Sequence, residues 1–301
     1  MIEKIGNVIL NLSFYTGQDK YSDGDIENEL LEIVKKHKDF GDITTRDNRW
    51  PVLYHLSKER ANIIEWFPMS KNQVALEIGA GCGAITGTLC DKVSRVTAVE
   101  LSKRRSQINA YRNATKENLD IIVGDLNDIK FTETYDVITL IGVLEYAQAF
   151  TTSKQPFHDF LANIKQLLKP GGKLLIAIEN KFGLKYWAGS REDHTGGFFD
   201  SIEGYPSIEH VKTFSKSELT RLLCEVGFQN QIYYYPIPDY KLPFQIFSDD
   251  RLPKIGELRD LLHNYDQQRI QLFDESIVYD QLIKNDQFSF FANSFLVVCE
   301  Q

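Results

Sequence analysis

Apolar and polar positions alternate along the middle of the chain in a way that predicts buried strands separated by amphipathic helices. Short apolar runs typical of strands occupy residues 74–78, 95–99, 119–123, 135–141 and 173–178. Apolar residues with helical spacing lie between them, at residues 84–90, 103–111 and 157–168. Since strands that alternate with helices are joined by crossover connections, the pattern predicts a doubly wound parallel α/β sheet.

The segment before this sheet has a different pattern. Residues 1–54 are polar, with one amphipathic helix expected at 26–34, and we expect them to form a helical lead. The core itself covers residues 55–180 and opens on a helix whose N-cap is Ser57.

After residue 180 the regular alternation ends. We expect a lid and a sixth strand at 181–235, an inserted cap at 236–284 and a last strand within 285–301. Ser215 and Glu218 have the spacing of a capping box. The cap is expected to be structured, because an irregular stretch of that length is unusual in a compact domain.

A glycine cluster follows the first core strand, in the sequence EIGAGCGA (77–84). Glycines let the backbone turn tightly and approach a ligand, and the helix that follows presents free N–H groups. Glu100 ends the second strand and Asp125 follows the third. Carboxyl ends of neighbouring parallel strands share one crevice, where carboxylates can accept from a ribose and an adenine. Glu77 beside the loop would repel a pyrophosphate and suit a cationic ligand.

Together these segments resemble the class I S-adenosylmethionine-dependent methyltransferases. The resemblance rests on ALEIGAGCGAITGTL (75–89), AVE (98–100), GDL (124–126), YDVITLIGVLEYA (135–147) and LKPGGKLLIAIEN (168–180). It implies an enzyme that uses S-adenosyl-L-methionine. It also implies a Rossmann-like, seven-stranded sheet whose last strand is antiparallel.

The resemblance further implies roles for the residues around the glycine cluster. Glu77 and Gly79 would meet the methionine part of the cofactor. Gly81 and Gly83 would shape the turn, and Glu100 would bind the ribose hydroxyls.

The remaining cofactor contacts come from later strand ends. By the same resemblance, Asp125 and Leu126 would bind the adenine, while Ile141 and Gly142 would line the methyl-transfer site. Many relatives have His after Val-Leu-Glu, whereas this chain has Tyr146, so proton transfer by a histidine at this position is in doubt.

The methyl group on a sulfonium is already activated, so the protein mainly has to align the acceptor and exclude water. A hydroxyl acceptor must also lose its proton. Glu179, at the end of the fifth strand, is one candidate general base. Asp193 and His194 are two more, in a polar run flanked by glycines that suits a mobile lid. No spacing of His, Cys or carboxylates predicts a metal site.

Three other segments, 15–25, 179–206 and 238–250, look like those of a bacterial subgroup associated with glycosyltransferases and surface-polysaccharide synthesis. We therefore expect O-methylation of a small-molecule or glycan acceptor, with a glycosyltransferase as a partner. The aromatic residues of the predicted lid are compatible with packing against sugar rings.

The composition of the chain limits which partners, cross-links and cellular locations are expected. The formal net charge of −8 over 301 residues disfavours a nucleic-acid partner held by bulk electrostatics. The four cysteines are dispersed and predict neither disulfides nor a zinc ribbon. No apolar run is long enough for a transmembrane helix, and the N-terminus has no basic region or cleavage site, so we expect a cytoplasmic protein.

Two alternatives use the same residues. Gly79-x-Gly81-x-x-Ala84 also fits the dinucleotide fingerprint of an NAD-dependent oxidoreductase, although Glu77 and the expected antiparallel last strand oppose it. The second alternative is a noncatalytic partner subunit with a cofactor-binding fold. The intact set of glycines and carboxylates argues against this alternative, because a protein that no longer binds cofactor does not need it.

Overall fold

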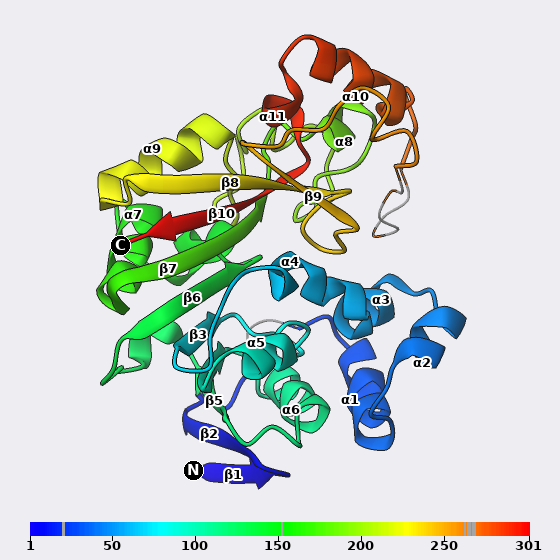
Figure 1. Cartoon of the computed structure of the whole chain (residues 1–301). Coiled ribbons are helices and arrows are strands. Elements are labelled where there is room, and N and C mark those ends of the chain that lie inside the picture. The colour runs from blue at the N-terminus through cyan, green and yellow to red at the C-terminus, as the bar shows by residue number, and fades with distance from the viewer. Residues whose placement is uncertain (20–21, 152, 262, 264–265, 267–268) are drawn as a thin grey trace. The chain divides into compact units, whose positions relative to one another are not determined.

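The computed structural model describes residues 1–301 except 20–21, 152, 262, 264–265 and 267–268 (Figure 1). It divides into two compact units. Unit 1 comprises Met1–Leu140 and Leu167–Gly172, and unit 2 comprises Ile141–Gln166 and Lys173–Gln301.

Unit 1 has strands in the order β1-β2-β5-β4-β3-β6. They are β1 (Ile2–Ile5), β2 (Val8–Phe14), β3 (Val74–Ile78), β4 (Arg95–Glu100), β5 (Leu119–Gly124) and β6 (Tyr135–Ile141). All neighbouring pairs are parallel except β1 with β2. The helices that follow β3 and β4 are α5 (Thr86–Lys92) and α6 (Lys103–Arg112). The alternation of strands and helices predicted for this part of the core is confirmed.

The N-terminal lead, which we expected to be helical, begins instead with two strands. The side chains of Val8 and Leu10 are 0% exposed, whereas Ile9 between them is 41% exposed, which is the period of a strand. Because an apolar residue occupies the outward position, the sequence hides this alternation. β2 pairs in parallel with β5, so the sheet extends beyond the predicted seven strands.

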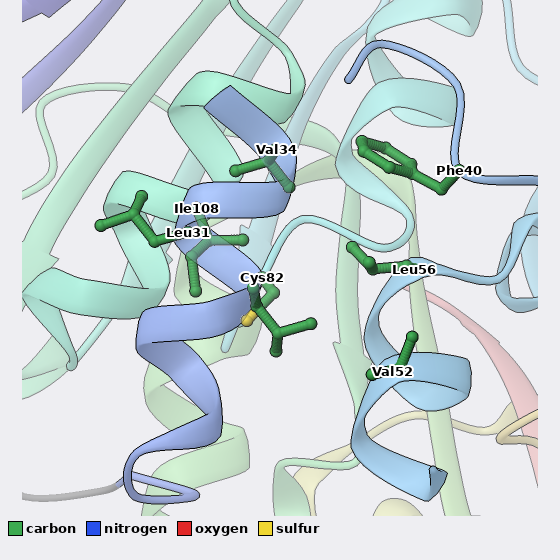
Figure 2. Close-up of a cluster of buried hydrophobic side chains, with 8 residues drawn as sticks. Leu31, Val34, Phe40, Val52, Leu56, Cys82 and Ile108 are labelled. Carbon is green, nitrogen blue, oxygen red and sulfur yellow. The ribbon is translucent and has the colours of Figure 1, made fainter. Parts of the chain in front are cut away.

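Three helices of the lead follow these strands, namely α1 (Ile26–Lys36), α2 (Gly41–Arg46) and α3 (Trp50–Leu56). Eight buried side chains join the lead to α6 and to the glycine cluster (Figure 2): Leu30, Leu31, Val34, Phe40, Val52, Leu56, Cys82 and Ile108. Burying each large apolar side chain contributes about 1.5–3 kcal/mol. The turn that carries Cys82 is therefore supported by the lead.

The helix expected to begin at Ser57 is wrong in detail. The Ser57 side chain makes no capping hydrogen bond, and the chain there forms a short 3₁₀ turn, η1 (Lys58–Ala61), followed by α4 (Asn62–Glu65). The reason is that α3 already ends at this point, where Ser57 has extended backbone.

The described residues of unit 2 form four strands in the order β7-β10-β8-β9, and each neighbouring pair is antiparallel. They are β7 (Leu168–Glu179, with 168–172 in unit 1), β8 (Asn230–Ile237), β9 (Gln245–Ser248) and β10 (Ser294–Glu300). The last strand, β10, lies between β7 and β8. The antiparallel last strand implied by the resemblance is thus confirmed.

The helices of unit 2 are short. They are η3 (Leu144–Phe150), α7 (Pro156–Gln166), α8 (Leu184–Trp187), α9 (Lys216–Val226), α10 (Glu275–Lys284) and α11 (Phe288–Phe291). The capping box of Ser215 and Glu218 at the start of α9 is confirmed, and Gly227 ends that helix with a φ of 96°. No helix among the described residues is both long and apolar enough to cross a membrane.

The segment expected as a cap contains regular structure. β9 and α10 lie within residues 236–284, although 262, 264–265 and 267–268 of that segment lie outside the described residues. Residues 20–21 of the segment 15–25 also lie outside them.

Candidate active site

The glycine cluster in unit 1 forms the turn between β3 and α5. Gly79, Gly81 and Gly83 all have positive φ, at 71°, 52° and 76°. A Cβ on Gly83 would lie 2.3 Å from Oδ1 of Asn109, so this position also requires a close approach of backbone to side chain. The backbone N–H of Gly79 donates to the carbonyl oxygen of Val99 at 2.9 Å, which ties the turn to the end of β4.

Glu100 is the carboxylate that the structure brings to this turn. Its Oε2 accepts the Gly81 N–H at 2.8 Å, and its Oε1 accepts the Ser102 N–H at 2.9 Å. Burial raises the pKa of the Glu100 carboxyl, although these two hydrogen bonds favour the charged form. Each oxygen keeps a second lone pair, so the carboxylate can still accept from a ligand.

Glu77 is engaged inside unit 1. The Thr86 hydroxyl donates to Glu77 Oε2 at 2.6 Å, and the Asn109 amide donates to the Thr86 hydroxyl at 3.0 Å. Burial raises the pKa of the Glu77 carboxyl to about 8, against the opposing hydrogen bond from Thr86. This carboxyl therefore joins the glycine turn to α5 and α6.

Asp125 follows β5 and begins a short 3₁₀ helix, η2 (Leu126–Asp128). Its side chain accepts the backbone N–H of Asn127 at 3.0 Å and is half-buried, as is Leu126. The residue before it, Gly124, packs against Phe14, to whose Cβ an added Cβ would come within 2.6 Å.

The last two predicted cofactor residues, Ile141 and Gly142, belong to unit 2. Gly142 has a φ of 70° and donates its N–H to the carbonyl oxygen of Ala177 on β7 at 2.9 Å. An added Cβ would lie 2.8 Å from the Tyr240 hydroxyl. The backbone is thus turned sharply at the end of β6, as glycine permits.

Unit 2 brings Glu179 and His194 together and adds Glu145. His194 Nε2 lies 3.6 Å from Glu145 Oε1 and 3.7 Å from Glu179 Oε2. Glu145 lies in η3 and Glu179 ends β7, so the three side chains come from separate segments. Both glutamates are fully buried, and the Tyr146 ring packs edge-on against the imidazole with centroids 5.4 Å apart.

The run around His194 is a buried network, in contrast to the polar lid that the sequence indicated. Glu192 is 0% exposed and accepts from His194 Nδ1 at 2.9 Å and from the Tyr205 hydroxyl at 3.0 Å. Burial opposes a charge on the imidazole, but the carboxylates of Glu179, Glu145 and Glu192 outweigh it and raise the His194 pKa well above its ordinary value.

Asp193, the third candidate base, is held by cations. Lys185 Nζ lies 2.8 Å from Asp193 Oδ2, and Lys241 Nζ pairs with Oδ1. Despite burial, these two lysines and His194 keep the Asp193 pKa well below its ordinary value. A carboxylate stabilised so strongly in its charged form is a poor proton acceptor, so its geometry favours a structural role.

Lys241 links the two groups of carboxylates. Its Nζ also lies 3.0 Å from Glu179 Oε1. Four residues of this site were not predicted from the sequence: Glu145, Glu192, Lys185 and Lys241. For Glu145 a signal was present, since it precedes Tyr146 in the segment that carried the resemblance.

The fold and the glycine turn define a cofactor-binding α/β protein, and comparison with known proteins identifies the class. Residues 76–176 match the family described as "Methyltransferase domain". These residues therefore carry a class I S-adenosylmethionine-dependent methyltransferase domain, whose cofactor is S-adenosylmethionine.

Curated relatives cover parts of the chain. A malonyl-[acyl-carrier protein] O-methyltransferase of Priestia megaterium is 29% identical over 104 residues, which are 34% of this chain and 35% of that protein. A ribosomal RNA small subunit methyltransferase A of Fusobacterium nucleatum is 24% identical over 208 residues, covering 67% of this chain and 69% of that protein.

Among solved structures, the chain is similar to phosphoethanolamine N-methyltransferase 1 of Haemonchus contortus, in complex with phosphoethanolamine and S-adenosylhomocysteine. The identity is 14% and the TM-score 0.50, with 92% of this chain and 48% of that chain covered. This likeness confirms the fold. The chain thus spans about a third of the first curated relative and about half of this structure, and the acceptors of these proteins differ.

Proposed function

We propose that this protein transfers the methyl group of S-adenosylmethionine to an oxygen atom of a small-molecule or glycan acceptor. The observation that carries the cofactor half of the proposal is the contact of the buried Glu100 carboxylate with the Gly81 N–H at 2.8 Å. This contact holds the carboxylate that is proposed to accept from the ribose beside the glycine turn, where the space next to Gly81 is open.

The cofactor contacts in this proposal are those that the resemblance implied. Gly79 meets the methionine part, Glu100 the ribose, and Asp125 with Leu126 the adenine. For Glu77 the proposal is modified, because its carboxyl accepts from the Thr86 hydroxyl and so supports the turn.

The acceptor half rests on unit 2. Ile141 and Gly142 are proposed to line the methyl-transfer site, and Glu145 follows Gly142 after only two residues in the chain. Glu179 and His194, two of the predicted bases, lie against Glu145. The carboxylates of this cluster could take up a proton, which suits a hydroxyl acceptor, because an alcohol must lose its proton as the new bond forms.

A glycan acceptor, a glycosyltransferase partner, a role in surface-polysaccharide synthesis and a cytoplasmic location remain parts of the proposal that rest on the sequence alone. The formal net charge of −8 supports an acceptor other than nucleic acid. The similarity to a ribosomal RNA methyltransferase makes RNA the sharpest competing acceptor to test.

The first experiment is a calorimetric titration with S-adenosylhomocysteine, with NAD as the parallel ligand. We expect micromolar binding of S-adenosylhomocysteine alone, about −8 kcal/mol. Glu100→Gln should weaken it at least about tenfold, or 1.4 kcal/mol, because the neutral amide accepts more weakly from the ribose hydroxyls. The exposed Glu117→Gln serves as the matched control.

Binding of NAD alone would contradict the proposal and favour the oxidoreductase. Radiolabelled methyl transfer then separates the acceptors, with monosaccharides, nucleotide sugars and short RNA hairpins as the arms. Label in RNA and none in the sugars would refute the glycan acceptor while leaving the cofactor assignment intact.

A further inference from the structure

The cluster of Glu145, Glu179 and His194 has the spacing of a metal-ligand set. One ligand atom from each side chain lies within 4.8 Å of the others. His194 Nε2 is 3.6 Å and 3.7 Å from the nearest carboxylate oxygens, which is too long for a hydrogen bond. Two ligands bound to one ion at about 2.1 Å are about 3.0–3.4 Å apart, so each of the two His194 distances is a few tenths of an ångström longer than a bound ion requires.

The carboxylates also carry oxygens that nothing else satisfies. Glu145 Oε2 and Glu179 Oε2 accept no hydrogen bond from any described residue, and both are buried. Leaving an ionised oxygen buried without a donor is costly. Lys241 offsets part of the charge on Glu179 through Oε1, whereas the cationic partner of Glu145 is the His194 imidazole, at 3.6 Å.

The imidazole is oriented as a ligand would be. Glu192 can only accept, so His194 Nδ1 is the donor in their 2.9 Å hydrogen bond. When a metal ion displaces the proton on Nε2, the lone pair of that nitrogen lies beside Glu145 and Glu179. In metal sites, the histidine nitrogen that does not bind the ion usually donates its N–H to a carboxylate, as His194 Nδ1 does to Glu192.

The Glu192 carboxylate that orients His194 is itself held in place by backbone hydrogen bonds. Glu192 Oε2 accepts the backbone N–H groups of His194 and Thr195, each at 2.7 Å. The Tyr146 ring also packs edge-on against the imidazole. The ligand set is therefore held by the fold in the absence of an ion.

We propose that Glu145, Glu179 and His194 bind one divalent first-row transition-metal ion, of the Mn²⁺ or Zn²⁺ kind. Two carboxylates and one imidazole match the ligand preference of these ions, whereas Mg²⁺ prefers oxygen ligands alone. Two carboxylates and a divalent ion are together neutral. The sequence spacing did not predict this site, because its ligands are dispersed over three segments.

A role for the ion rests on the proposed function. The acceptor hydroxyl would occupy an open coordination position, where the ion lowers the cost of losing its proton. The O–H bond breaks and the proton passes to the free Oε2 of Glu145. The O–CH₃ bond then forms as the S–CH₃ bond breaks, and the sulfonium leaves as neutral S-adenosylhomocysteine.

Metal binding is tested without any acceptor. The full chain is stripped with EDTA, dialysed and titrated calorimetrically with MnCl₂, ZnCl₂ and MgCl₂ in turn. We expect one equivalent of Mn²⁺ or Zn²⁺ to bind, and Mg²⁺ to bind at least tenfold more weakly. The spectrum of bound Mn²⁺ by electron paramagnetic resonance gives an independent reading.

Variants locate the ion. Glu145→Gln and His194→Gln should abolish stoichiometric binding, and Glu192→Gln should weaken it about 10–100-fold through the orientation of the imidazole. Glu209→Gln, an exposed carboxylate of the same unit, is the matched control and should bind as the wild type does. Circular dichroism checks that each variant is folded.

Absence of stoichiometric Mn²⁺ and Zn²⁺ binding to the folded wild-type chain would overturn the inference, whether or not the variants fold. Unchanged binding by folded Glu145→Gln and His194→Gln would also overturn it. The same samples are titrated with S-adenosylhomocysteine. If that compound binds and the metals do not, only the metal site fails. If the metals bind and it does not, the proposed function fails.

Discussion

The buried carboxyl of Glu77 should make the stability of unit 1 depend on pH. This carboxyl is fully buried, and burial raises its pKa from 4.5 to about 8. In the unfolded chain the carboxyl loses its proton near pH 4.5, whereas in the folded chain it keeps the proton up to about pH 8. The folded state therefore binds more protons in this window, so the stability of unit 1 falls as the pH rises.

The magnitude follows from the shift. Each pH unit costs about 1.4 kcal/mol, so the 3.5 units between 4.5 and 8 amount to about 5 kcal/mol for this one group. Glu77→Gln removes the ionisation and keeps a side-chain oxygen that can accept from the Thr86 hydroxyl. We expect the variant to gain stability relative to the wild type as the pH rises from 5 to 8.

The assay is thermal unfolding of both proteins at half-unit pH steps, because other titrating groups cancel in the difference between them. At about 2–4 °C per kcal/mol, the roughly 4 kcal/mol expected between pH 5 and 8 should widen the difference in Tm by about 8–16 °C. Glu117→Gln, at an exposed position in the same unit, should give a flat difference. A flat difference for Glu77→Gln as well would refute the claim that a buried carboxyl is forced to keep its proton.

Two further substitutions test the packing of each unit. Gly83→Ala should destabilise unit 1 more than Gly81→Ala, because both glycines have positive φ but only Gly83 would place a Cβ against Asn109. Urea unfolding of both variants measures the difference in the free energy of unfolding. Equal losses of stability would contradict the close approach of Gly83 to Asn109. Asp193→Asn should cost about 3–5 kcal/mol by leaving two buried lysines short of a partner. Glu300→Gln breaks an exposed ion pair and should cost under about 1 kcal/mol, and a similar loss in both variants would contradict the buried network.

Local chemistry determined much of the fold. The positive φ angles at Gly79, Gly81 and Gly83 require glycine, so the turn is visible in the sequence. The capping box of Ser215 and Glu218 is equally local, since its two hydrogen bonds join residues three apart. Strand periods and strand-end residues such as Glu100 likewise depend on neighbours in the chain.

The tertiary structure decided what depends on distant partners. β2 is a strand because its backbone pairs with that of β5. This pairing partner is more than a hundred residues away in the chain, so the local sequence of β2 does not reveal it. Asp193 and His194 are neighbours in the chain, yet their side chains have different partners in the folded protein. Asp193 pairs with Lys185 and Lys241. His194 lies beside Glu145 and Glu179.

The candidate site shows the same division. Glu179 and His194 were recognised one at a time from their positions near a strand end and in a polar run, but their meeting with Glu145 was not. Side chains far apart in sequence converge only when burial of the strands and loops that carry them fixes their directions. Spacing along the chain therefore predicted the cofactor turn, whereas the buried carboxylate–histidine cluster exists only in the folded protein.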